Sequence, residues 1–206
     1  MTINAQPDDR KVAWILAAVI VSEGVWVLWS FVADPVRFVA VLGFAPSRSG
    51  SISGWILGTI VAASYVWSAA KIPAVRDNLL RPTFLKILAI LAAAMAAILE
   101  EVIFRKWVMD SLQRNGFGNE LQILASGLAF GLGHSIWGLI RLSVATALNA
   151  AISTTVLGLA LGVVYVISNR SLAACVVAHF VITALIEPGL IIAAVRNQLG
   201  FRVPGA

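Results

Sequence analysis

Charged residues are scarce in this sequence: they make up only 12% of the 206 residues, and the mean hydropathy is +0.91. Soluble domains typically carry about 25% charged residues, so this scarcity excludes an ordinary soluble domain. Hydrophobic residues account for 60% of the chain and stand in long runs. The sequence therefore predicts an all-α fold, a polytopic membrane helix bundle with about six transmembrane helices.

Cysteine is nearly absent as well, because Cys175 is the only one and lies within an apolar run. A single cysteine excludes an intramolecular disulfide and a Cys-rich metal site. No basic stripe interleaved with aromatic residues is present, so nucleic acid is not an expected partner. The expected surroundings are a lipid membrane, and the 7 tryptophans fit anchors at its two interfaces.

The apolar runs divide the chain into two parts. Residues 1–83 hold an N-terminal tail and the first two transmembrane helices, and residues 84–206 hold a core of four. The basic loop at residues 71–86 separates them and, by the positive-inside rule, places both termini in the cytoplasm. The expected helices cover residues 12–32, 52–70, 84–112, 121–140, 143–167 and 172–195.

Ionisable residues inside these apolar runs are the strongest indication of function, because such groups are costly in a membrane. Glu101 and Arg105 are four residues apart, so they share a helix face and can form an ion pair. Glu100 is rotated by about 100° from Glu101 around the helix. The pairing therefore leaves Glu100 to face a cavity, where it can accept and return a proton.

The only two histidines, His134 and His179, lie on two other expected helices. At about 1.5 Å per residue, Glu100, His134 and His179 lie roughly 12–19 Å from the turns that end their helices. All three turns are expected on the same side of the membrane. We therefore expect the three side chains to lie at comparable depth.

Three short motifs contain these residues and follow one another in order. They are Glu-Glu-x-x-x-Arg at residues 100–105, Phe-x-x-x-His at residues 130–134, and His179 with Thr183 four residues later. Over about residues 85–195, this ordered set resembles the CPBP intramembrane proteases, which include CAAX prenyl endopeptidases and bacterial Abi-type proteins. The resemblance implies a CPBP-like catalytic core at residues 84–206 in a bacterial inner membrane protein.

The same resemblance implies a glutamate-type, metal-independent endopeptidase that needs no cofactor. Its partners are the membrane and a peptide or protein substrate in or near the bilayer, either membrane-associated or exported. Glu100 and His134 would activate the attacking water, and His179 would help stabilise the oxyanion. The implied site residues are Glu100, Glu101, Arg105, His134, His179 and Thr183.

Thr183 departs from the family pattern, which usually has an asparagine four residues after the second histidine. A hydroxyl has one donor and a shorter reach than an amide. Losing an oxyanion donor costs about 10²–10³ in rate, so this chain either compensates or is slow. Asn149 on the expected helix at residues 143–167 is an alternative donor.

Other interpretations of the same residues stay open. The Thr183 departure favours a non-catalytic immunity or scaffold protein on the same fold, and Glu23 in the middle of the first span favours a small transporter or proton pathway. Cys175 lies one turn before His179 and can form a nucleophilic Cys–His pair. Two histidines with a glutamate can also bind zinc. For Glu187 we expect a structural role.

Overall fold

The computed structural model describes residues 7–46, 48–136 and 144–195, and every regular element in these ranges is a helix. The predicted all-α class is therefore confirmed. The elements are α1 (Pro7–Ala33), α2 (Pro35–Val41), α3 (Ile52–Ala69), α4 (Pro73–Asn78), α5 (Phe84–Glu101), the π-helix η1 (Val102–Met109), α6 (Asp110–Arg114), α7 (Asn119–His134), α8 (Val144–Ile167) and α9 (Ala173–Val195).

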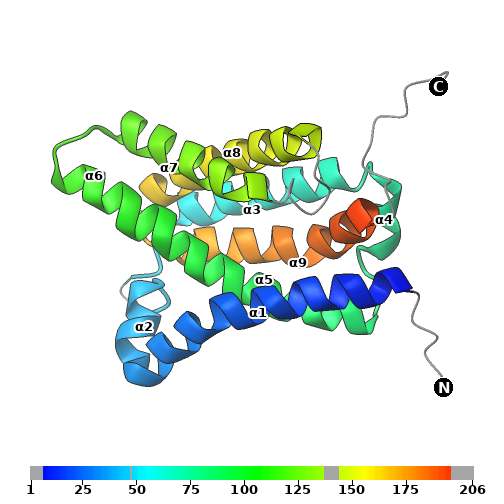
Figure 1. Cartoon of the computed structure of the whole chain (residues 1–206). Helices are drawn as coiled ribbons and strands as arrows, with labels where there is room; N and C mark the ends of the chain where they lie inside the picture. The colour runs from blue at the N-terminus through cyan, green and yellow to red at the C-terminus, as the bar shows by residue number, and fades with distance from the viewer. Residues whose placement is uncertain (1–6, 47, 137–143, 196–206) are drawn as a thin grey trace.

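The long helices run side by side in a bundle (Figure 1). Five stretches in the described ranges are long and apolar enough to cross a membrane, and α7 is a further long helix beside them. The predicted bundle of about six membrane helices agrees with this architecture. Part of the predicted helix at 121–140 falls at residues 137–143, outside the described residues. The five spans are Arg10–Ala33, Ile52–Ala69, Phe84–Arg114, Ala147–Ile167 and Ala173–Ile192.

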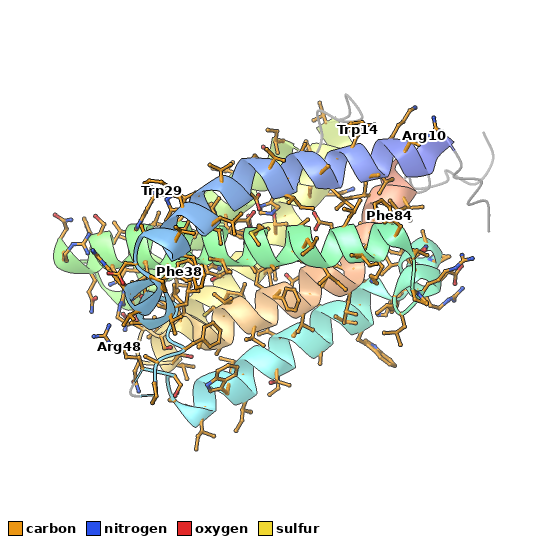
Figure 2. The ribbon with its side chains drawn as sticks, turned by 90° about the horizontal axis from the view of Figure 1, so that it is seen from below. Arg10, Trp14, Trp29, Phe38, Arg48 and Phe84 are labelled. Carbon is orange, nitrogen blue, oxygen red and sulfur yellow. The ribbon has the colours of Figure 1, made fainter. Side chains whose placement is uncertain are left out.

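The outer surface of the bundle is apolar, as contact with lipid requires. Trp14 and Trp29 on α1 are 77% and 73% exposed and point away from the bundle (Figure 2). Soluble monomers rarely expose apolar surface on this scale. The surface therefore fits an integral membrane protein, in which lipid covers these side chains.

α9 is the most buried of the five spans and contacts α1, α3, α4, α5 and α8. It contains Pro188, which has no N–H and leaves the carbonyl of Ala184 without its helical partner. Nζ of Lys86 on α5 donates to that carbonyl at 2.9 Å and to the Leu185 carbonyl at 3.2 Å. Lys86 thereby compensates for the proline and ties α5 to α9.

Glycines allow α7 and α8 to approach closely. A Cβ added to Gly131 on α7 would lie 2.6 Å from the Ala151 carbonyl oxygen on α8. A Cβ on Gly158 of α8 would lie 3.0 Å from Cα of Gly127 on α7. Small residues at such contacts are the usual means of close packing in membranes. This contact holds α7, with His134 at its end, against α8.

We expect Gly131→Ala to lower the stability of the bundle, because the new methyl group meets the Thr155 side chain and the Ala151 carbonyl oxygen of α8. Overpacking of this kind costs about 1–3 kcal/mol. Gly133→Ala is the matched control on the same helix, because its nearest neighbour is Phe104 Cζ at 3.9 Å. The measurement is the thermal unfolding midpoint of each purified variant in detergent. Equal midpoints for the two variants would contradict the close contact of α7 with α8.

Candidate active site

Glu101 and Arg105 form the ion pair that their spacing predicts. Arg105 Nε lies 3.1 Å from Glu101 Oε2, and both side chains are 0% exposed. Arg105 Nη2 also donates to the Gly158 carbonyl on α8 at 3.0 Å. The pair therefore neutralises two charges inside the bundle and ties η1 to α8.

Arg105 belongs to a π-helical segment that the sequence did not predict. The chain continues from α5 into η1 without interruption, and the Asp110 N–H bonds the Arg105 carbonyl five residues earlier. π-helical turns inside α-helices are rare and frequent at functional sites. Here the π-helix begins directly after Glu101.

His179 connects both glutamates to α9. Its Nδ1 lies 2.8 Å from Glu101 Oε1, and its Nε2 lies 3.6 Å from Glu100 Oε2. Because the carboxylate of Glu101 accepts, Nδ1 carries the proton of this hydrogen bond. The imidazole is only 3% exposed, so the bond fixes Nε2 toward Glu100.

His134 approaches Glu100 from α7. Its Nδ1 lies 2.9 Å from the Phe130 carbonyl, which can only accept, so Nδ1 is the donor. In the neutral ring the lone pair of Nε2 then faces outward, 3.8 Å from Glu100 Oε2. This distance exceeds a direct hydrogen bond, and a water that contacts both groups fits such a separation.

Phe130 lies between the two histidines. Its ring centroid is 4.4 Å from that of His134 and 5.5 Å from that of His179. The Arg105 guanidinium carbon lies 5.2 Å from the same centroid, within the range of a cation–π contact. Phe130 therefore sets the spacing of the two imidazoles over the buried ion pair.

Glu100, Phe130, His134 and His179 border one cavity of about 450 Å³ between the helices. Its volume is within the range typical of ligand sites, about 300–1,000 Å³. The sequence-predicted residues on its wall are Glu100, His134, His179, Thr183 and Asn149. Arg105 is fully buried and is not among the described residues that line the cavity. Its guanidinium is therefore poorly placed to bind the charged end of a peptide substrate.

Two further glutamates line the same cavity. Glu23 comes from α1, so the wall is not confined to the predicted four-helix core at residues 84–206. Oε2 of Glu23 and Oε2 of Glu100 are buried without a hydrogen-bond partner among the described residues. Glu187, for which the sequence suggested only a structural role, also lies on the wall and precedes Pro188 in α9.

The structure also bears on the two rival interpretations, a Cys175 nucleophile and a zinc site. Cys175 is buried, and its Sγ lies 3.4 Å from the Leu161 carbonyl. It is not among the described residues that line the cavity. Within residues 7–46, 48–136 and 144–195, no group of three or more His, Cys, Asp or Glu side chains is arranged to hold a metal ion.

A polar cluster of glutamates and histidines inside a lipid-facing helix bundle defines an integral membrane protein with a polar site between its helices. The family model described as type II CAAX prenyl endopeptidase Rce1-like matches residues 82–185, which is half of the chain. The chain belongs to this family and therefore to the protease-type hydrolases of membranes. No curated protein and no solved structure matches it.

The family match confirms the resemblance to CAAX-type proteases that the motifs predict. All six sequence-predicted site residues, from Glu100 to Thr183, fall inside the matched segment. Glu23 and Glu187 fall outside it. The cavity is thus built partly from residues that the family pattern does not include.

We expect Arg105→Met to destabilise the protein, because it leaves the Glu101 carboxylate buried without its cation. Removing one partner of a buried pair costs about 3–5 kcal/mol. The double variant Glu101→Gln/Arg105→Met removes both charges, so its loss should be smaller than that of Arg105→Met alone. Unfolding midpoints in detergent measure both effects. Arg114→Met, on the exposed end of α6, is the control and should unfold like the wild type. If Arg105→Met and Arg114→Met had the same unfolding midpoint, the buried pair would contribute nothing to stability.

Proposed function

We propose that the chain is a metal-independent, glutamate-type intramembrane endopeptidase. The observation that carries this proposal is the position of Glu100 Oε2, which lies 3.8 Å from His134 Nε2 and 3.6 Å from His179 Nε2. The three groups come from three helices and meet at the wall of one interior cavity. A carboxylate and two imidazoles in this arrangement can hold, deprotonate and orient a water.

In the proposed reaction, Glu100 and His134 bind the water from two sides. Glu100 accepts a proton while the water oxygen forms a bond to the scissile carbonyl carbon, which becomes tetrahedral. The peptide C–N bond then breaks, and Glu100 returns the proton to the leaving amine. Each proton transfer of this kind contributes about 10²–10⁴ in rate.

His179 and Thr183 are the proposed donors to the oxyanion. His179 donates from Nε2 as an imidazolium, with its Nδ1–H still bound to Glu101. His179 is held by the Glu101 carboxylate, whose other oxygen is paired with Arg105. Glu101 and Arg105 therefore act as positioning residues, because they orient the imidazole and do not reach the cavity. Thr183 lies one turn further along α9 on the same cavity wall.

The substrate that we propose is a peptide or protein in or near the bilayer of a bacterial inner membrane. α1 begins and α9 ends at the end of the bundle that carries α4, which is part of the basic loop (Figure 1). By the positive-inside rule this end is cytoplasmic, as are both termini. Ile72 in that loop is part of the cavity wall, which favours substrate entry from the same side.

Glu100→Gln should abolish cleavage and leave folding intact, because the amide keeps the shape of the side chain and cannot accept the proton. The expected loss in cleavage rate is about 10²–10⁴-fold. The measurement compares protein termini in cells that express the wild type or the variant at matched levels. Glu120→Gln, at the exposed start of α7, is the control and should match the wild type. A wild-type set of termini with Glu100→Gln would rule out this mechanism.

A non-catalytic immunity or scaffold protein on the same fold is the second candidate function. The hydroxyl at Thr183, in place of the usual amide, favours it.

If the chain is a protease, Thr183→Val should lower kcat with little change in KM. Loss of an oxyanion donor costs about 10²–10³ in rate. Thr154→Val is the control on the same cavity, because the Thr154 hydroxyl already donates to the Ala150 carbonyl at 2.7 Å.

The same kinetic assay separates Thr183 from the alternative donor, Asn149. We expect Asn149→Ala to keep a kcat close to that of the wild type, whereas Thr183→Val has a much lower kcat. The reverse order would assign the oxyanion contact to Asn149. Absence of any cleavage by the wild type, with a folded protein and its membrane partners present, would favour the scaffold function.

A further inference from the structure

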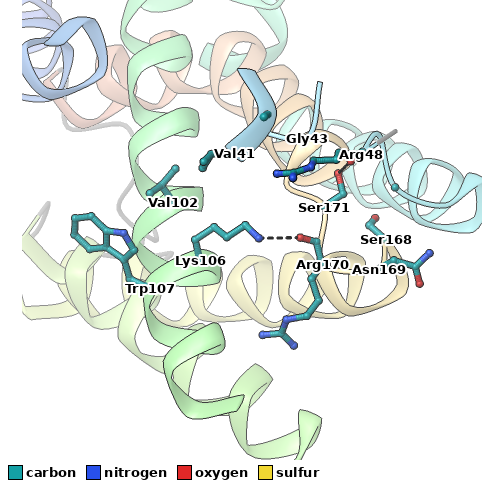
Figure 3. Close-up of a pocket in the computed structure, with 12 residues that line it drawn as sticks. Val41, Gly43, Arg48, Val102, Lys106, Trp107, Ser168, Asn169, Arg170 and Ser171 are labelled. Carbon is teal, nitrogen blue, oxygen red and sulfur yellow. Dashed lines mark hydrogen bonds between the residues drawn. The ribbon is translucent and has the colours of Figure 1, made fainter. Parts of the chain in front are cut away.

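A second cavity, of about 620 Å³, lies at the end of the bundle away from α4. It forms where the loop between α2 and α3, the π-helix η1 and the turn between α8 and α9 meet (Figure 3). Neither Glu100 nor either histidine lines it. It is therefore distinct from the proposed active site.

Basic residues from each of these three segments line the cavity: Arg48, Lys106 and Arg170. The Arg170 guanidinium itself points away from the other two (Figure 3) and donates to Asp110 and Gln122. No carboxylate is among its described lining residues. Asp110 behind the wall pairs with Arg170 at 2.7 Å and with Lys106 at 3.5 Å. One carboxylate cannot balance three cations, and Arg48 has no carboxylate partner in the described part of the chain. The cavity thus carries an excess of positive charge.

Hydrogen bonds hold the three segments in place. The Ser171 hydroxyl donates to the Arg48 carbonyl at 2.6 Å, and Lys106 Nζ donates to the Arg170 carbonyl at 3.3 Å (Figure 3). Gly50 has φ +81°, and a Cβ there would lie 3.0 Å from the Ser168 carbonyl oxygen. The glycine therefore lets the loop close on the α8–α9 turn, and the cavity exists before any ligand binds.

The remaining polar groups of the wall also favour an anion. Ser168 also lines the cavity, and its hydroxyl packs against Gly54 of α3 without a hydrogen-bond partner among the described residues. α3 and α9 begin within two residues of Gly50 and Ser171, so the positive ends of two helix dipoles lie at this cavity. The two helix ends therefore add positive charge to the field of the basic residues, which favours an anionic ligand.

The apolar part of the wall indicates the level of the membrane at which the cavity lies. Val41, Val102 and the half-exposed Trp107 line it beside the basic groups. Tryptophan is typical of the membrane–water interface. Arginine and lysine side chains at that level can form charge-assisted hydrogen bonds with the phosphate of a lipid headgroup. A lipid phosphate would meet the cations while its glycerol and first acyl carbons contact the two valines.

We propose that this cavity is a phosphate-binding site, occupied by the headgroup phosphate of a phospholipid or by a soluble phosphate ester. Arg48 is the side chain whose charge is available to the ligand. Lys106 and Arg170 are partly neutralised by Asp110, so they add a weaker field and shape the wall. The site does not depend on proteolysis and can be tested without a known substrate.

The test measures lipid binding to the full-length protein in detergent by native mass spectrometry. The probes are phosphatidylglycerol and diacylglycerol with the same acyl chains, which differ by the phosphate headgroup. We expect phosphatidylglycerol to bind at least about tenfold more tightly, since about 1.4 kcal/mol of charge-assisted contact is enough for that ratio. Equal binding of the two lipids would overturn the proposal.

Arg48→Gln should lower the affinity for phosphatidylglycerol about tenfold or more, and Arg48→Lys should restore most of it. Arg37→Gln, on the exposed neighbouring helix α2, is the matched control and should bind like the wild type. All variants are first required to have the wild-type unfolding midpoint. Wild-type binding by Arg48→Gln would overturn the proposal.

Competition with glycerol phosphate separates the two sources of phosphate. Displacement of the lipid at millimolar concentration would assign the site to a soluble phosphate ester. Failure to displace it, with the Arg48 dependence intact, would assign the site to the lipid headgroup. Both results support a phosphate site, and they differ only in the molecule that carries the phosphate.

Discussion

The site depends on how one buried cation is neutralised. Arg105 lies inside an apolar bundle, where an uncompensated charge would cost several kcal/mol. Glu101 on the same helix supplies the opposite charge, and its second oxygen then holds His179 of α9 at 2.8 Å. Because Arg105 also bonds the Gly158 carbonyl of α8, the pair links three helices. The geometry around Glu100 therefore follows from the need to compensate Arg105.

Features that depend on local spacing were predictable from the sequence. The long apolar runs predicted the long helices, although α1 begins five residues before the expected start at residue 12 and the short helices α2 and α4 were not predicted. The four-residue spacing predicted the Glu101–Arg105 pair. The shared depth of Glu100, His134 and His179 was predictable because the rise per residue of a helix is nearly constant. Their meeting at one cavity agrees with that estimate.

Features that depend on the packing of distant segments were not predictable. Glu23 reaches the cavity only because α1 packs against α5, and Glu187 does so on a helix whose proline gap is filled by Lys86 from α5. The π-helix η1 has no signal in composition, since it is defined by a choice between hydrogen-bond partners four and five residues away. The basic cavity likewise combines three segments far apart in the sequence.

The placement of the buried pair on a single helix also bears on biogenesis. Each apolar segment enters the bilayer before the bundle assembles, and a lone arginine or glutamate makes that entry costly. Since Glu101 and Arg105 are partners along one helix, they can neutralise each other as that segment inserts. The hydrogen bond to His179 can form only later, when α9 docks. Insertion can therefore be completed before the polar cluster is assembled.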